Sequence, residues 1–153
     1  MLYYTKMEIL IDYISKQKLL LTKWIGTLNL KDYEESIVNF NSFCKKFEVK
    51  YVIHNISELE YTEGDGVFDT SIIEEVAKKR SMIPRLEYTV VFITQKPKDI
   101  VYSHLYAQEL QIKGNYQYCS TVEKALELLL INDSSLNIET RFLSISTNIK
   151  KSF

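Results

Sequence analysis

The chain has few of the residues that interrupt secondary structure or link a fold covalently. Among 153 residues there are two prolines, four glycines and two cysteines. Cys44 and Cys119 are too few for a disulfide framework or a zinc site. We therefore expect free thiols and a reducing, cytoplasmic location. No stretch rich in Gly, Ser or Pro divides the sequence, which favours one domain.

The sequence also lacks an excess of one charge and any long apolar run. Its formal net charge is −1, so no basic field is available to attract nucleic acid or anionic lipid. The apolar run from Leu128 to Ile131 has four residues, far fewer than the roughly 20 of a membrane span. The first residues do not form a secretory signal. We expect no nucleic-acid partner and no membrane span.

Sequence motifs of common catalytic sites are missing as well. The chain has no glycine-rich phosphate loop and no nucleophile elbow. Its two histidines, His54 and His104, do not have the spacing of a metal-binding pair. We therefore expect a non-enzymatic protein without a cofactor or metal site.

What the sequence does contain is a regular alternation of strand and helix patterns. Runs rich in aliphatic and aromatic residues predict strands. The predicted strands cover residues 8–14, 19–25, 50–55, 87–94 and 116–119. The first two are separated by a four-residue polar turn, which predicts an antiparallel hairpin, and Gly26 is expected to end the second strand.

Helices are predicted between the later strands from apolar spacing and from capping residues. Apolar residues recur at helical steps from Tyr33 to Phe47, with Asp32 as the expected N-cap. A second helix over residues 71–82 opens with Ser71 as its cap. A third helix covers residues 98–112. A fourth starts after Ser120, which is its expected cap.

The resulting order is β-β-α-β-α-β-α-β-α. It predicts a single mixed, mostly parallel α/β sheet with an antiparallel N-terminal edge strand and helices on its faces. Residues 1–131 form the predicted domain. Residues 132–153 fall outside the alternation, and the sequence leaves open whether they are a C-terminal tail or a segment docked on the domain or on a partner.

This layout resembles the STAS-like fold of small bacterial proteins such as anti-sigma-factor antagonists and of the cytoplasmic domain of sulphate transporters. The resemblance is carried by the strand that ends in Leu20-Leu21-Thr22-Lys23-Trp24-Ile25-Gly26, the strand near Asn55 and the strand Val90 to Thr94. It is also carried by the closing strand and helix, Tyr118-Cys119-Ser120-Thr121-Val122-Glu123-Lys124-Ala125-Leu126. It covers residues 7–131 and implies a regulatory, protein-interaction role.

The resemblance also implies a position for phosphorylation. In the antagonists a phosphorylated serine begins a helix within an Asp-Ser-Ser-Gly sequence. Asp69-Thr70-Ser71-Ile72 stands in the corresponding place, without the glycine and after a longer loop. Ser71 is the candidate phosphorylation position, although its place as a helix N-cap fully explains this serine and is the favoured interpretation.

The residues that follow the third predicted strand are the candidate site. They are predicted to be irregular from Ile56 to Phe68 and carry Glu58, Glu60, Glu63, Asp65 and Asp69. Ligands of open α/β sheets bind beyond the carboxyl ends of the strands, and long loops in compact domains are often functional. The candidate binding residues are His54, which is expected to end the strand, Asn55, Tyr61, Asp65, Asp69 and Ser71.

Three functions remain open at this point. The first is a non-enzymatic regulatory domain whose partner is another protein or a second copy of the chain, with the strand at residues 8–14 as an edge that supports dimers. The second is a binder of a small apolar or lipid-like ligand in a cavity between sheet and helices. The third is an acid-base enzyme that uses His54 with a loop carboxylate.

Overall fold

The computed structural model describes residues 6–60, 78, 89–96, 116–132 and 134–147. The elements within these ranges are β1 (Glu8–Ile14), β2 (Leu19–Thr27), α1 (Leu30–Lys46), β3 (Tyr51–Glu60), β4 (Thr89–Ile93), β5 (Tyr116–Cys119), α4 (Val122–Leu128), the 3-10 turn η1 (Ser134–Leu136) and α5 (Ile138–Thr147). The helix predicted over 98–112 lies outside the described residues, and so does the one predicted over 71–82 apart from residue 78.

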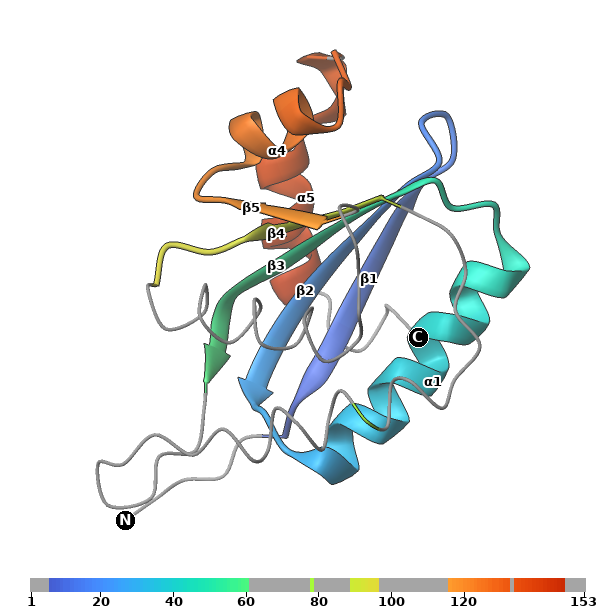
Figure 1. The fold of residues 1–153 in the computed structure, drawn as a ribbon, viewed down its shortest axis with the longest axis vertical. Coiled ribbons are helices and arrows are strands. Elements are labelled where there is room, and N and C mark those ends of the chain that lie inside the picture. Colours follow the sequence, from blue (N-terminus) through green and yellow to red (C-terminus); the bar gives the residue numbers. More distant parts are fainter. Residues whose placement is uncertain (1–5, 61–77, 79–88, 97–115, 133, 148–153) are drawn as a thin grey trace.

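The five strands form one sheet in the order β1-β2-β3-β4-β5 (Figure 1). β1 pairs antiparallel with β2, and β2, β3, β4 and β5 pair in parallel. The prediction of a mixed, mostly parallel α/β sheet with an antiparallel N-terminal edge strand is confirmed. The carboxyl ends of four neighbouring strands therefore meet along one edge of the sheet.

Each face of the sheet carries its own apolar core, because side chains alternate along every strand. On one face Leu20, Val52 and Val90 pack against Ile37 and Phe40 of α1. On the other face the core is formed from the sheet, α4, η1 and α5 by Leu10, Leu21, Ile53, Val91, Ala125, Leu136, Phe142 and Ile145. Figure 1 shows α1 on one side of the sheet and both α4 and α5 on the other.

The N-cap of α1 is Asn29 rather than the expected Asp32. The Asn29 side chain accepts a hydrogen bond from the backbone N–H of Asp32 at 2.9 Å. Asp32 lies in the first helical turn and is buried. Its Oδ2 accepts from the Met7 backbone N–H at 3.0 Å and from Asn29 Nδ2 at 2.8 Å. The carboxylate thus ties the residue before β1 to the start of α1.

The cap of α4 is likewise shifted, from the expected Ser120 to Thr121, whose hydroxyl accepts from the Lys124 N–H at 3.1 Å. At its C-terminus the N–H of Leu130 donates to Glu127 O, and the N–H of Ile131 donates to Leu126 O. This pair of bonds is a Schellman motif, and it places Leu130 in the left-handed region at φ 58°.

Two strands extend beyond their predicted ends. β2 passes through Gly26 to Thr27, so Gly26 does not end it. Gly26 adopts φ +83°, and a Cβ atom there would lie 2.0 Å from the carbonyl oxygen of Lys6. β3 continues to Glu60, so residues 56–60, which were expected to be irregular, are strand.

Beyond the predicted domain, α5 packs across β1 and β2. Leu136, Ile138, Phe142 and Ile145 are all buried. Arg141 Nη1 reaches both carboxylate oxygens of Asp12 in β1, at 3.0 and 3.3 Å. One apolar stripe and one ion pair therefore hold this helix on the sheet.

Candidate functional site

A buried lysine lies on the α4/α5 face of the sheet near the carboxyl ends of β2 and β3. Lys23 is 6% exposed, and its Nζ lies 2.7 Å from Glu58 Oε2, on a side chain that is 55% exposed. The β2–β3 register shifts between Lys23 and Ile25. A buried ammonium requires a partner, so the ion pair holds the Glu58 carboxylate at the rim of the sheet.

A second lysine organises the end of β3 from the segment after β4. Lys96 Nζ lies 3.8 Å from Glu60 Oε1 and donates to the Leu59 carbonyl at 3.5 Å. The Glu60 side chain is 70% exposed. Asn55 Oδ1 accepts a hydrogen bond from the Ser57 N–H at 3.1 Å. The end of β3 thus presents two carboxylates, of which Glu58 is held by a buried lysine and Glu60 lies near the exposed Lys96.

His54 lies inside the core on the α1 face of the sheet. It is 6% exposed, its Nδ1 is 2.6 Å from Thr22 Oγ1, and Trp24 Nε1 donates toward both atoms at 3.2 Å. The rings of Phe40 and Phe92 lie 5.6 and 5.3 Å from the imidazole. The expectation that His54 ends its strand is wrong, because β3 continues for six more residues to Glu60.

The predicted site residues are therefore only partly described. Asn55 is half-buried in β3, on the opposite face of the sheet from His54. The sheet consequently separates His54 from Asn55 instead of bringing them together. Tyr61, Asp65, Asp69 and Ser71, with the candidate phosphorylation position, lie outside the described residues, as do Glu63 and His104.

Lys23 and Lys96 were not among the predicted site residues. The signal for Lys23 is present in the sequence, because a lysine interrupts the apolar run from Leu19 to Ile25. A charged residue within a buried strand needs a fixed counter-charge. The identity of that partner, Glu58, depends on the parallel pairing of two strands far apart in the sequence. Lys96 gives no comparable signal.

The cysteines are both free thiols, as predicted. Cys44 lies on the buried face of α1, within the core on that side of the sheet. Cys119 at the end of β5 is half-buried, and its Sγ donates to the Thr121 carbonyl at 3.3 Å. Burial raises the pKa of the Cys119 thiol above its ordinary value. The group is therefore less ionised near neutral pH than an exposed cysteine.

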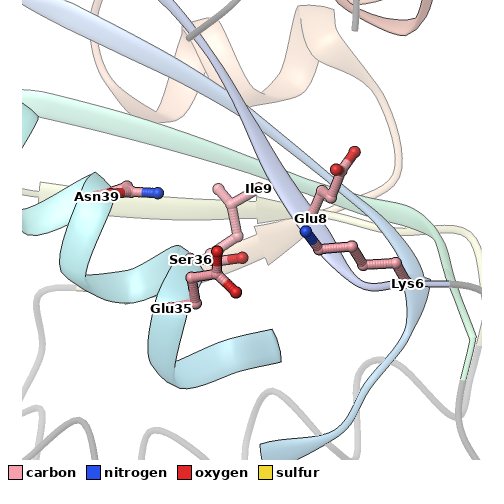
Figure 2. A pocket seen from close by; sticks show the side chains of 6 residues that line it. All are labelled: Lys6, Glu8, Ile9, Glu35, Ser36 and Asn39. Carbon is pink, nitrogen blue, oxygen red and sulfur yellow. The ribbon is translucent and has the colours of Figure 1, made fainter. Parts of the chain in front are cut away.

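A small groove opens between the start of β1 and the first half of α1 (Figure 2). Its volume is about 150 Å³, and its lining is Lys6, Glu8, Ile9, Glu35, Ser36 and Asn39. Pockets for drug-sized ligands have volumes of roughly 300–1,000 Å³ and mostly apolar walls. A groove this small and this polar does not support the alternative of an apolar or lipid-like ligand.

Within the described ranges, no group of three or more His, Cys, Asp or Glu side chains is placed to hold a metal ion. Among the helices that the structure describes, none is long and apolar enough to cross a membrane.

Comparisons with known proteins show which solved structures share this fold. No protein-family model matches the chain, and no curated protein matches it in sequence. The crystal structure of an uncharacterized DUF3478-family protein with a SpoIIAA-like fold, from Shewanella loihica PV-4, matches with a TM-score of 0.58 and 17% identity. The match covers 84% of this chain and 99% of that chain.

The anti-sigma factor antagonist SpoIIAA in its unphosphorylated form matches with a TM-score of 0.48 and 10% identity, over 82% of this chain and 99% of that chain. The fold assignment rests on the DUF3478-family structure and on the order and directions of the five strands. The chain has a SpoIIAA-like fold, which is the STAS-like fold that the sequence predicts.

Proposed function

We propose that the chain is a non-enzymatic regulatory domain that binds another protein through the carboxyl edge of its sheet, in the cytoplasm. The observation that carries the proposal is the ion pair between buried Lys23 and exposed Glu58 at 2.7 Å. A carboxylate held by an interior lysine is already ordered before a partner arrives. Ordering it costs little conformational entropy on binding.

Charge at this edge suggests the chemistry of the partner. Glu58 and Glu60 project from the last residues of β3 with side chains that are 55% and 70% exposed. Lys23 is buried beneath the rim, so the surface that a partner meets is acidic at Glu58. A basic protein surface is complementary to it, and such complementarity gives specificity and fast association.

The residues after β3 belong to the same proposal. Tyr61, Asp65, Asp69 and Ser71 follow Glu60 in the sequence, and we propose that they extend the recognition surface. Phosphorylation of Ser71 would add negative charge and acceptor oxygens to it. Asn55 contributes from within β3. His54, which is 6% exposed, supports the edge from the core.

Site-specific cross-linking tests this assignment. A photo-reactive amino acid replaces Glu60 in one variant and Glu139, an exposed residue of α5, in a control. In cells of the source organism, position 60 is expected to give a discrete adduct that position 139 does not. Excess wild-type protein should suppress the adduct in an extract, whereas excess Glu60→Lys protein, which keeps the Lys23–Glu58 pair, should not. Equal adducts at both positions, or equal suppression by both competitors, would contradict the proposal.

A further inference from the structure

One flank of α1 carries opposite charges at its two ends. Glu35, Asn39, Ser42 and Lys46 follow one another at i, i+4, i+7 and i+11 and so form a single stripe along the helix. All four are exposed. Among the described residues, neither Glu35 nor Lys46 takes part in an ion pair. The stripe therefore presents an acid, two small polar side chains and a base, in that order.

The stripe is complementary to itself when it is reversed. If a second copy of α1 lies antiparallel beside the first, with a two-fold axis between Asn39 and Ser42, Glu35 of each copy faces Lys46 of the other. Asn39 of each copy then faces Ser42 of the other. A two-fold interface doubles every such contact. Antiparallel helices also set the positive end of one helix dipole beside the negative end of the other.

The groove beside β1 lies at the acidic end of this stripe. Glu35 and Asn39 form one of its walls, and Glu8 and Lys6 come from the strand side (Figure 2). Figure 2 shows the Lys6 side chain extending toward α1. Its two carboxylates, from Glu8 and Glu35, outnumber its one ammonium group. An incoming lysine side chain from a second copy would balance the charge of the groove.

Exposed apolar side chains next to the stripe indicate that another protein covers this surface and that it is not simply solvated. Val38 is 50% exposed and Phe47 is 39% exposed. The Lys46 ammonium lies 5.7 Å from the centroid of the Phe47 ring. An acidic start and a basic end also stabilise the helix itself through its dipole, but that effect does not account for the exposed valine in the middle of the helix.

We propose that two copies of this chain associate through antiparallel contact of their α1 helices, with Lys46 of each copy paired with Glu35 at the groove of the other. This self-association is independent of the proposed protein-binding edge. The stripe fits a second copy of itself because a two-fold axis reverses the charge order and sets each acid opposite a base. A partner surface of uniform charge would not match this order.

Sedimentation velocity and native mass spectrometry of the full chain test the proposal across a wide concentration range. The wild-type protein is expected to move from a monomer of 18.0 kDa to a species of twice that mass as its concentration rises. Added salt should weaken the dimer, because exposed charge pairs are screened. A wild-type protein that stays monomeric throughout the range would overturn the proposal.

Charge exchange identifies the pair. Glu35→Lys is expected to raise the dimer dissociation constant about tenfold, because both symmetry-related pairs become repulsive. Lys46→Glu should do the same. The double variant Glu35→Lys/Lys46→Glu should restore the wild-type dissociation constant. Because a misfolded protein could not regain the dimer, this recovery would show that the single variants act through charge.

The control for this series is Glu139→Lys, the same substitution on exposed α5, which should leave the dissociation constant unchanged. A dimer that survives Glu35→Lys unaltered would show that the copies meet elsewhere. Failure of the double variant to restore association would show that the antiparallel register is wrong.

Discussion

His54 Nδ1 lies 2.6 Å from Thr22 Oγ1, across the parallel pair of β2 and β3 and inside the core on the α1 face. The indole N–H of Trp24 can only donate, and it points toward both atoms at 3.2 Å. All three groups are satisfied when the Thr22 hydroxyl accepts from Trp24 and donates to His54. The polar atoms of a largely apolar core are in this way hydrogen-bonded to one another.

Replacing the hydroxyl tests this network. Thr22→Val is expected to lower the free energy of unfolding by about 1 kcal/mol, because the hydrogen bond from Thr22 to His54 is lost and Trp24 keeps only His54 as an acceptor. The matched control is Thr89→Val in β4, at an exposed position, which should change little. Urea unfolding followed by the fluorescence of the single tryptophan measures both. Equal effects of the two substitutions would contradict the network.

Docking of α5 is tested by two neighbouring apolar residues. Phe142 is 4% exposed and Leu143 is 65% exposed. Phe142→Ala is expected to cost about 3–5 kcal/mol through lost burial and a cavity, whereas Leu143→Ala should stay within about 0.5 kcal/mol of wild type. Thermal and urea unfolding compare them. Similar stabilities for both variants, or unchanged stability after deletion of the residues beyond 134, would show that the helix does not contribute to the fold.

Leu130 offers a stabilising substitution. It occupies the left-handed C-terminal position of the Schellman motif after α4 at φ 58° and is 92% exposed. Leu130→Gly is expected to raise the free energy of unfolding by about 1 kcal/mol, because a side chain in this conformation costs roughly 1–2 kcal/mol. Leu130→Ala is the control, since alanine keeps the conformational cost. A gain from alanine equal to that from glycine would assign the effect to the exposed leucine side chain instead.

The Cys119 thiol gives a prediction of pH dependence. Burial raises its pKa, so its reactive thiolate forms at higher pH than in an exposed cysteine. Alkylation by iodoacetamide at neutral pH is expected to be slower at Cys119 than at a cysteine in an unstructured peptide, and to accelerate at more alkaline pH. Cys44, which is buried in the core, should react only on unfolding. Peptide mapping by mass spectrometry separates the two sites. Rapid modification of Cys119 at neutral pH would contradict its described environment.

The strand and helix order follows from local sequence patterns, but the ends of elements do not. β3 was expected to end at Asn55, before a stretch predicted to be irregular from Ile56 to Phe68. The structure continues it to Glu60 because those residues pair with the end of β2, where Ile25 lies opposite Glu58. That pairing across the sheet, invisible in a local pattern, moves His54 from a strand end into the core.

The exact positions of the helix N-caps also could not be predicted from local sequence. Asn29 and Asp32 are both residue types that cap helices well, and so are Ser120 and Thr121. The choice between Asn29 and Asp32 depends on tertiary contacts, because Asp32 is needed as the acceptor for the Met7 N–H. The docking of α5 was also open, since its pairing of Arg141 with Asp12 joins residues at opposite ends of the sequence.

One part of the candidate site could be predicted from the sequence and another part could not. Its position at the carboxyl ends of the strands is a prediction from the parallel sheet, and Glu58 and Glu60 are among the last residues of β3 at that end. The pairing of Lys23 with Glu58 could not be inferred, because it depends on a register shift between β2 and β3.

The affinity of the acidic edge for the protein that cross-links to it tests the central claim most directly. Isothermal titration calorimetry would compare wild-type protein with Glu60→Gln, which keeps size, removes charge and leaves Glu58 paired with buried Lys23, and with Glu139→Gln as the control. We predict that Glu60→Gln binds about tenfold more weakly, while the control binds like wild type. Equal affinity of all three proteins would contradict recognition by this edge.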